Sequence, residues 1–368
     1  MALHDVIGQE RAINVLMRTI QRGRIPSSYL FAGESGIGKK FTAINLAKAV
    51  NCLKPPSPSF SKGGIGGFDT ESTPSLTLPP REGGLGWDVD CCDKCPSCQK
   101  IDAGVHPDFL LISPHGGQIR IEEIRAIDEM LSFKPFEGRE KVIIVDEADT
   151  MNPFAANAFL KTLEEPPEES LIILVSPKPD RLPDTIRSRC SRVNFTPLSH
   201  EACEKVIVKI KEQESKTRNS SREPVNEKES DSQLSTLIRL SMGRPGLAIS
   251  SDLIEERTWC LKLLRGMLKS EKDGWTSREE IERWLDLILI LLRDVAILKI
   301  TQDEKHLINM DLKNYIQNLS SSTDLMVIIE NYQKLSILKG YLNFNLNKSL
   351  TWNFVSSLLR RTMHKTYA

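Results

Sequence analysis

The sequence has no excess of charge of either sign and no apolar run long enough to cross a bilayer. Its 368 residues include 49 Lys and Arg against 49 Asp and Glu, so the formal net charge is zero. The whole chain is therefore not a polyelectrolyte that binds nucleic acid through bulk charge, which leaves only local patches for such binding. The most apolar run, residues 284–298, is interrupted by Asp286, Arg293 and Asp294 and predicts a buried helix.

We also expect no secretory leader, because charged residues stand where the apolar core of a signal peptide would lie. Eight cysteines in such a chain predict a reducing compartment, and they favour metal-binding thiolates or core cysteines over disulfides. We therefore expect a cytoplasmic protein with no membrane partner.

Periodicity divides the chain into an α/β part and a helical part. Strands and helices alternate through residues 1–197, which predicts a parallel sheet. Residues 198–252 and 253–368 have helical spacing, so we expect a small helical lid domain and an all-α C-terminal domain. Residues 53–88 are rich in Pro, Gly and Ser, and they predict a flexible insertion within the first domain.

The stretch GESGIGKK, residues 33–40, follows an apolar strand and precedes a helix, as a phosphate-binding loop (P-loop) requires. Its backbone N–H groups would surround an anion, and Lys39 would contact the β- and γ-phosphates. Lys40 replaces the hydroxyl residue that normally ligates Mg²⁺, and an ammonium repels a cation. Thr42 lies about 200° further around the helix and faces the wrong side. We expect weak or absent Mg²⁺-dependent hydrolysis, while nucleotide binding stays open.

A second motif follows the apolar run at residues 141–145, where Asp146 and Glu147 stand together. This pattern is typical of a Walker B strand, in which Asp146 holds Mg²⁺ and Glu147 polarises the attacking water. The intact pair favours an alternative function, an active ATPase that uses its own site. Two acids that merely cap a strand are the plainer alternative.

Three arginines, Arg187, Arg189 and Arg192, follow the apolar run at residues 171–175. An exposed arginine at a subunit edge can stabilise charge on a neighbour's phosphate in trans. A basic surface patch is the plainer alternative, and the sequence mechanics alone do not choose among the three.

Cys92, Cys95 and Cys98 have C-x₂-C spacing after the insertion, and Cys52 precedes it. Four thiolates at this spacing are typical of a structural, tetrahedral Zn²⁺ site without an open position. Cys91 is an alternative ligand, although it breaks the spacing. A redox pair would leave the third cysteine unexplained.

Several segments together resemble the delta-prime type of subunit in the clamp-loader branch of the AAA+ ATPases. They are VIGQERAI, HPDFLLI, IRIEEIRAI, FEGREKVIIVDEADTMNPFAANAFLKTLEEPPEE and RLPDTIRSRC. The resemblance implies an AAA+ domain at residues 1–197 with a zinc-binding module at 52–98, a lid at 198–252 and an oligomerising collar at 253–368.

The resemblance also implies a function in DNA replication, within the DNA polymerase III holoenzyme. Such a subunit helps to load the sliding clamp on primed DNA and has no independent ATPase activity. Its partners would be the gamma/tau and delta subunits, the sliding clamp and, through the assembled ring, primer–template DNA. Arg189, in a Ser-Arg-Cys triplet, would be the arginine finger that acts on a neighbouring subunit, and Glu147 would be vestigial.

The same resemblance gives the ligand sets. A structural Zn²⁺ would be held by Cys52, Cys92, Cys95 and Cys98, and ATP or ADP would bind weakly or not at all. The sensor arginine would be Arg244, with Ser176 as a first sensor. The candidate nucleotide-binding residues are Gly33, Gly36, Gly38, Lys39, Lys40, Asp146 and Arg244.

Overall fold

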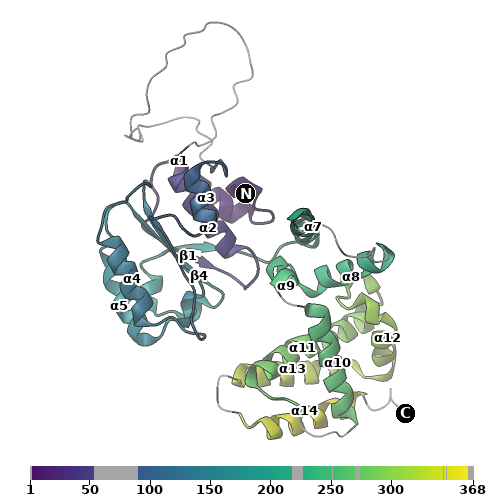
Figure 1. Cartoon of the computed structure of the whole chain (residues 1–368). Coiled ribbons are helices and arrows are strands. Elements are labelled where there is room, and N and C mark those ends of the chain that lie inside the picture. Colours follow the sequence, from purple (N-terminus) through teal and green to yellow (C-terminus); the bar gives the residue numbers. More distant parts are fainter. Residues whose placement is uncertain are drawn as a thin grey trace, which may run out of the picture. The chain divides into compact units, whose positions relative to one another are not determined.

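The computed structural model describes residues 2–53, 90–217, 227–250, 252–269, 274–342, 344 and 346–363. The chain forms two compact units, Met1–Val206 with Arg244–Gly246, and Ile207–Gly243 with Leu247–Ala368 (Figure 1). Almost all of the predicted insertion at 53–88 lies outside the described residues. The division into three domains at 197/198 and 252/253 stays a prediction.

The first unit is built on a five-stranded sheet in the order β2-β3-β4-β1-β5. All its strand pairs are parallel. Both β3 and β4 are buried along their whole length, because apolar strands in a parallel sheet are covered on both faces. The predicted α/β domain with a parallel sheet is confirmed. The strands are β1 Ser28–Ala32, β2 Phe109–Ile112, β3 Lys141–Val145, β4 Ser170–Ser176 and β5 Ser191–Asn194.

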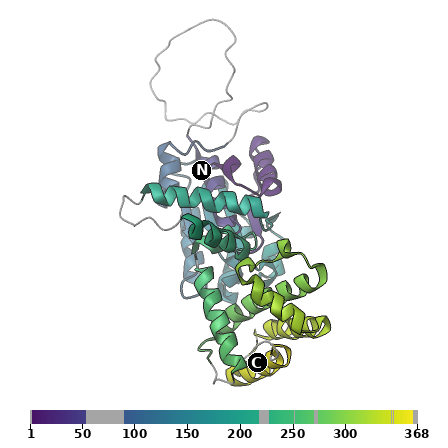
Figure 2. The same ribbon diagram turned by 90° about the vertical axis from the view of Figure 1, so that its right-hand side faces the viewer.

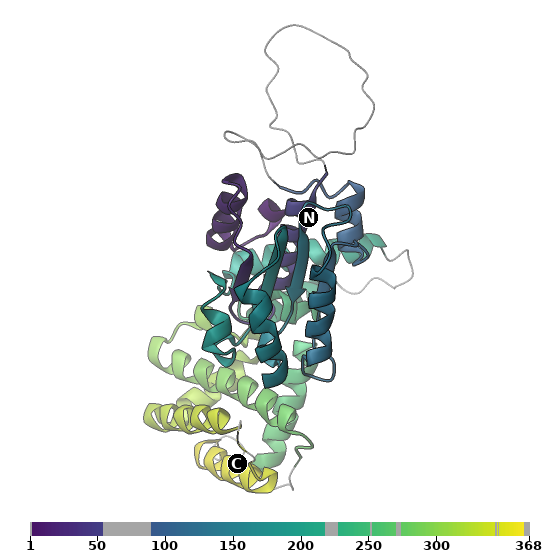
Figure 3. The same ribbon diagram turned by 90° about the vertical axis from the view of Figure 1, so that its left-hand side faces the viewer.

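Helices cover the two faces of this sheet. On one face, α4 (Ile121–Leu131) and α5 (Pro153–Glu164) pack against each other and share a core with β3 and β4 (Figure 3). From the opposite face, α2 (Lys39–Asn51) contacts the same two strands (Figure 1). Asn152 caps α5, since its side chain accepts a hydrogen bond from the N–H of Ala155. The remaining helices of this unit are η1 Leu3–Asp5, α1 Glu10–Gln21, α3 Pro96–Asp102, η2 Ala148–Thr150, η3 Pro179–Arg181 and α6 Asp184–Arg187.

In the second unit, α11 (Arg278–Thr301) is the central helix and contacts α10, α12 and α13 (Figure 2). Trp284 of α11 is fully buried, and Trp275 packs edge-on against both Trp284 and Trp352. The predicted buried helix at 284–298 is confirmed by this core. The other helices of this unit are α8 Glu227–Leu240, α10 Leu253–Leu268, η4 Glu304–His306, η5 Met310–Leu312, α12 Lys313–Ser322, α13 Leu325–Tyr341 and α14 Lys348–Met363. Two helices, α7 His200–Thr217 and α9 Pro245–Ser250, have residues in both units.

No helix among the described residues combines the length and the apolar character that crossing a bilayer requires.

The loop that follows α4 is fixed by a buried carboxylate. Asp108, just before β2, accepts hydrogen bonds from the N–H groups of Phe136, Glu137 and Gly138 at 2.7, 2.8 and 2.7 Å. Burial alone would raise the pKa of Asp108, but these three donors hold the pKa below its ordinary value of 3.8. The charged carboxylate therefore stabilises the folded loop.

We expect Asp108→Asn to lower the free energy of unfolding by ~2 kcal/mol at pH 7, because a neutral amide oxygen replaces a charged acceptor. The pKa of Asp108 is lowered in the folded state, so its contribution is present above the unfolded pKa and is lost as the pH falls through the folded pKa. Urea unfolding from pH 7 downward should show the two proteins converging in acid. Equal stability at pH 7 would contradict this assignment.

Candidate functional site

The P-loop joins the end of β1 to the start of α2. A Cβ atom at Gly33 would lie 2.4 Å from the carbonyl oxygen of Phe195, so only glycine fits this position. Gly38, the residue before α2, has φ +97°, in the region that favours glycine. The glycine spacing that predicted the loop therefore has a steric basis in this fold.

The Lys39 ammonium lies inside the loop. Its Nζ donates to the carbonyl oxygens of Gly33 and Glu34 at 2.6 and 2.5 Å. Burial lowers the pKa of Lys39 to about 8, although nearby carboxylates, Asp146 first among them, act in the opposite direction. Two backbone acceptors of the loop thus hold the charge that would contact a phosphate.

Lys40 forms an ion pair with the acid of the second motif. The Lys40 Nζ lies 3.1 Å from Oδ2 of Asp146, the residue that follows β3. The other oxygen, Oδ1, accepts the N–H of Glu147 at 3.0 Å. The hydroxyl of Thr42 donates to the carbonyl oxygen of Gly38 at 2.9 Å and is buried. Both Asp146 oxygens therefore have partners within the chain, and one partner is a cation.

The sensor candidates also have internal partners. The Arg244 guanidinium lies 3.4 Å from the Glu34 carboxylate, between Nη1 and Oε2. Gly246 donates its N–H to the carbonyl oxygen of Gly36 at 2.8 Å. Ser176 is fully buried and donates to Oδ1 of Asp149 at 2.7 Å. The structure thus brings Arg244 to the P-loop, and its contact with nucleotide stays a prediction.

The three arginines lie in different settings. Arg187, at the end of α6, pairs with Asp180 and Asp184. Arg192 lies within β5, where its Nε donates to the side chain of Asn194. The partners of these two arginines lie within seven residues of them in the sequence, whereas Arg189 has a partner on α5.

Arg189 follows α6 and contacts the end of α5. Its Nη2 lies 2.6 Å from Oε1 of Glu164, and its Nη1 donates to the carbonyl oxygen of Thr185 at 2.7 Å. About a third of the Arg189 side chain, 34%, is exposed. The guanidinium is therefore both anchored and accessible.

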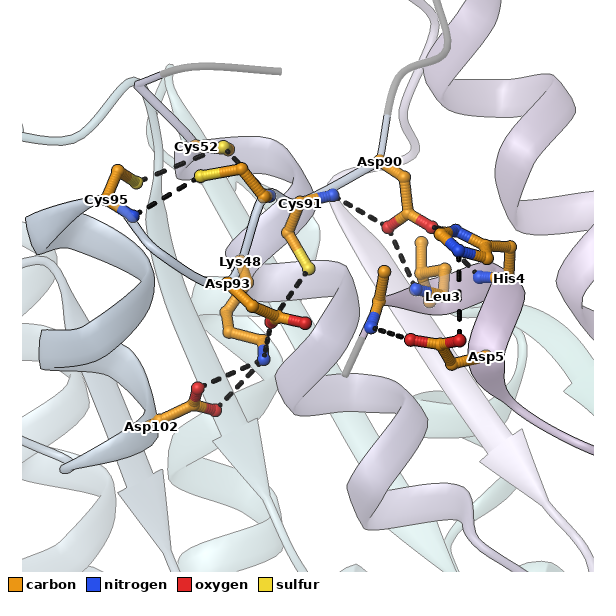
Figure 4. A network of polar contacts seen from close by, with 12 residues as sticks. Leu3, His4, Asp5, Lys48, Cys52, Asp90, Cys91, Asp93, Cys95 and Asp102 are labelled. Atoms are coloured by element: carbon orange, nitrogen blue, oxygen red, sulfur yellow. Dashed lines mark hydrogen bonds and ion pairs between the residues drawn. The ribbon is translucent and has the colours of Figure 1, made fainter. Parts of the chain in front are cut away.

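Four cysteines come together at the end of α2 and the start of α3. The sulfurs of Cys52, Cys92, Cys95 and Cys98 all lie within 4.8 Å of one another. Figure 4 shows two of them, Cys52 and Cys95, whose sulfurs are 4.0 Å apart. The backbone N–H of Cys92 donates to the Cys52 sulfur, and that of Cys95 donates to the Cys92 sulfur. Cys91 is outside this group of four, and its sulfur contacts Asp93. These four residues could hold a metal ion.

Beside the cysteines lies a buried lysine that the sequence reasoning missed. Lys48 of α2 is 1% exposed, and its Nζ contacts Asp93 at 2.6 Å and Asp102 at 3.1 Å (Figure 4). Burial alone would lower the pKa of Lys48, but the two carboxylates raise it above its ordinary value. The ion pairs fix α2 to the segment that carries Cys92 and to α3. The signal for this lysine in the sequence was a charged residue at a buried position of the helix.

The segment before Cys91 is tied to the N-terminus. Asp90 accepts hydrogen bonds from the N–H groups of Leu3 and His4 at 2.8 and 2.9 Å, and it contacts Nδ1 of His4 at 2.6 Å (Figure 4). The cysteine group is thus held by contacts from three separate parts of the sequence.

The sequence is similar to subunits of DNA polymerase III. A family profile described as "DNA polymerase III, delta subunit" matches residues 8–63 and 86–199. DNA polymerase III subunit delta' of Bacillus subtilis is 29% identical over 83% of this chain and 82% of its own length. DNA polymerase III subunit tau of Escherichia coli is 32% identical. That match covers 54% of this chain and 26% of the length of the relative.

Among solved structures, a DNA polymerase III gamma subunit-related protein of Thermotoga maritima is 18% identical. The match covers 94% of this chain and 99% of that one, with a TM-score of 0.39. The matches to the family profile and to subunit delta' agree with the P-loop domain described above. The chain belongs to the DNA polymerase III delta-prime family.

Proposed function

We propose that this chain is a clamp-loader subunit that does not hydrolyse ATP in its own site and acts on a neighbour's site through Arg189. Its partners would be gamma/tau and delta subunits, the sliding clamp and, through the assembled ring, primer–template DNA. Membership of the delta-prime family supports this assignment. The relatives include subunits named gamma and tau, which would be members of the same assembly.

The observation that carries the proposal is the Lys40–Asp146 ion pair. Mg²⁺ in nucleotide sites is held by carboxylate and hydroxyl oxygens together with the phosphates. Here the hydroxyl is absent and the carboxylate already has a cationic partner. Binding Mg²⁺ would require breaking the pair and placing a divalent cation beside an ammonium, which Coulomb repulsion opposes. The acid Glu147 remains in place but lacks the metal-bound substrate on which it would act.

Arg189 supports the second half of the proposal. Its anchored, partly exposed guanidinium has the geometry that stabilising a phosphate on another chain requires. An arginine finger contributes its charge in trans, so the subunit that supplies it need not bind nucleotide. The chain would therefore affect ATP hydrolysis on a neighbouring subunit, while its own P-loop would contribute only to the fold.

We expect Arg189→Ala to lower the ATPase rate of the reconstituted clamp loader by ~100-fold or more, because the transition-state charge loses its partner. Lys39→Ala in the same chain should leave that rate near wild type. The measurement is steady-state ATP hydrolysis with gamma/tau and delta subunits, sliding clamp and primed DNA.

Arg192→Ala is the matched control, since it removes a neighbouring positive charge that lies in β5. A wild-type rate with Arg189→Ala would refute the finger. A large loss with Lys39→Ala would favour the alternative, an ATPase that uses its own Asp146 and Glu147.

We also propose a structural Zn²⁺ bound by Cys52, Cys92, Cys95 and Cys98. Tetrahedral zinc with Zn–S bonds of about 2.3 Å places sulfurs about 3.8 Å apart, which fits the 4.0 Å between the Cys52 and Cys95 sulfurs. The two backbone N–H groups that point at these sulfurs would stabilise thiolates. When bound, the metal would close the base of the insertion and leave no position for a substrate.

Cys52→Ser should lower the zinc content from about one ion per chain and destabilise the fold, because one of four ligands is lost. Cys91→Ser, next to the site but outside the group, should keep the ion. Metal analysis of freshly reduced protein and thermal unfolding give the two readouts. Absence of zinc from the wild-type protein, or equal loss in both variants, would overturn the assignment.

We propose the division into an AAA+ domain at 1–197, a lid at 198–252 and a collar at 253–368, by analogy with the family.

A reducing, cytoplasmic setting is supported by the cysteines: all eight lie in the described residues and none forms a disulfide.

A further inference from the structure

We infer that Glu164 is a positioning residue that orients Arg189 toward a nucleotide phosphate on a neighbouring subunit. The inference rests on the proposed function, since it concerns the same arginine. Glu164 is the last residue of α5, and Arg189 follows α6, so the contact joins two separate elements.

The guanidinium is anchored at both of its terminal nitrogens. Nη2 lies 2.6 Å from Oε1 of Glu164, and Nη1 donates to the backbone oxygen of Thr185 at 2.7 Å. Because guanidinium is planar, one anchor on a helix end and one on the backbone of α6 restrict both its position and its plane. The Nε–H of Arg189 has no partner among the described residues, so further donor capacity remains for a phosphate.

Helix stability does not explain an acid at this position. The C-terminus of a helix carries partial negative charge, which disfavours a carboxylate in the last turn. Glu164 also has little to contribute as a stabilising pair, because it is 49% exposed and Arg189 is 34% exposed. Stability therefore does not account for the Glu164 carboxylate. Its contact with Arg189 accounts for it if the carboxylate orients the guanidinium.

The neighbouring arginine gives a useful contrast. Arg187 contacts Asp180 of η3 and Asp184 of its own helix α6, which are 85% and 87% exposed. Those contacts tie Arg187 to exposed side chains near it in the sequence. Glu164 instead places Arg189 relative to the helix that packs on the sheet, so the position of the arginine follows the core of the first unit.

The test compares Glu164→Gln with Glu165→Gln in the reconstituted loader. Glu165 is the adjacent acid, and no ion pair of its side chain is found in the described part of the chain, so it controls for loss of charge at the helix end. We expect Glu164→Gln to lower kcat for ATP hydrolysis by ~10-fold with little change in KM, because misplacement of a catalytic group affects the transition state more than binding. Glu165→Gln should leave both constants near wild type, and Glu164→Asp should restore part of kcat.

A double-mutant cycle separates positioning from a general effect on folding. Adding Glu164→Gln to Arg189→Ala should cause no further loss if Glu164 acts only through Arg189, whereas independent effects would multiply. A wild-type kcat for Glu164→Gln, a raised kcat, or multiplied losses would overturn the positioning role. If Arg189→Ala itself leaves kcat unchanged, the proposed finger fails, which is a separate result.

Discussion

The proposed function depends on the ion pair between Lys40 and Asp146, which joins the P-loop helix to the end of β3. In a hydrolysing site, a carboxylate at the end of the strand and a hydroxyl at the start of the helix hold a divalent cation between them. Here one ammonium replaces the hydroxyl and contacts the carboxylate at 3.1 Å. The Lys40 ammonium is therefore in the place of the Mg²⁺ that would arrive with the nucleotide. It neutralises the Asp146 carboxylate without a ligand.

The same pattern extends to the other cations of the site. Lys39 donates to carbonyl oxygens of the loop, and Arg244 pairs with Glu34. Each group that would contact phosphate thus has a partner within the first unit. Arg189 has its anchors on α5 and α6 instead of the P-loop, and 34% of its side chain is exposed. In the proposed function, this arginine acts on a neighbouring subunit while the chain's own site does not hydrolyse ATP.

Much of this could be predicted from local sequence. The glycine spacing and the apolar runs predicted the P-loop and the strands, and C-x₂-C spacing predicted the cysteine group. The effect of Lys40 was predicted as repulsion of Mg²⁺, but its ion pair with Asp146 joins positions 106 residues apart and required the fold. For the same reason Lys48, Asp90 and Asp108 were missed: the partners that satisfy their charges come from distant segments. Spacing also could not separate Cys52 from Cys91, which the three-dimensional grouping does.

If Lys40 occupies the position of the metal, Mg²⁺ should not tighten nucleotide binding to the isolated chain. A fluorescent ATP analogue would be titrated in Mg²⁺ and in EDTA. Lys40→Thr would supply the hydroxyl, and Lys40→Met would remove only the charge. The account predicts no tightening by Mg²⁺ for the wild-type protein or Lys40→Met, and tightening for Lys40→Thr. Wild-type binding that tightens in Mg²⁺ as much as that of Lys40→Thr would contradict it.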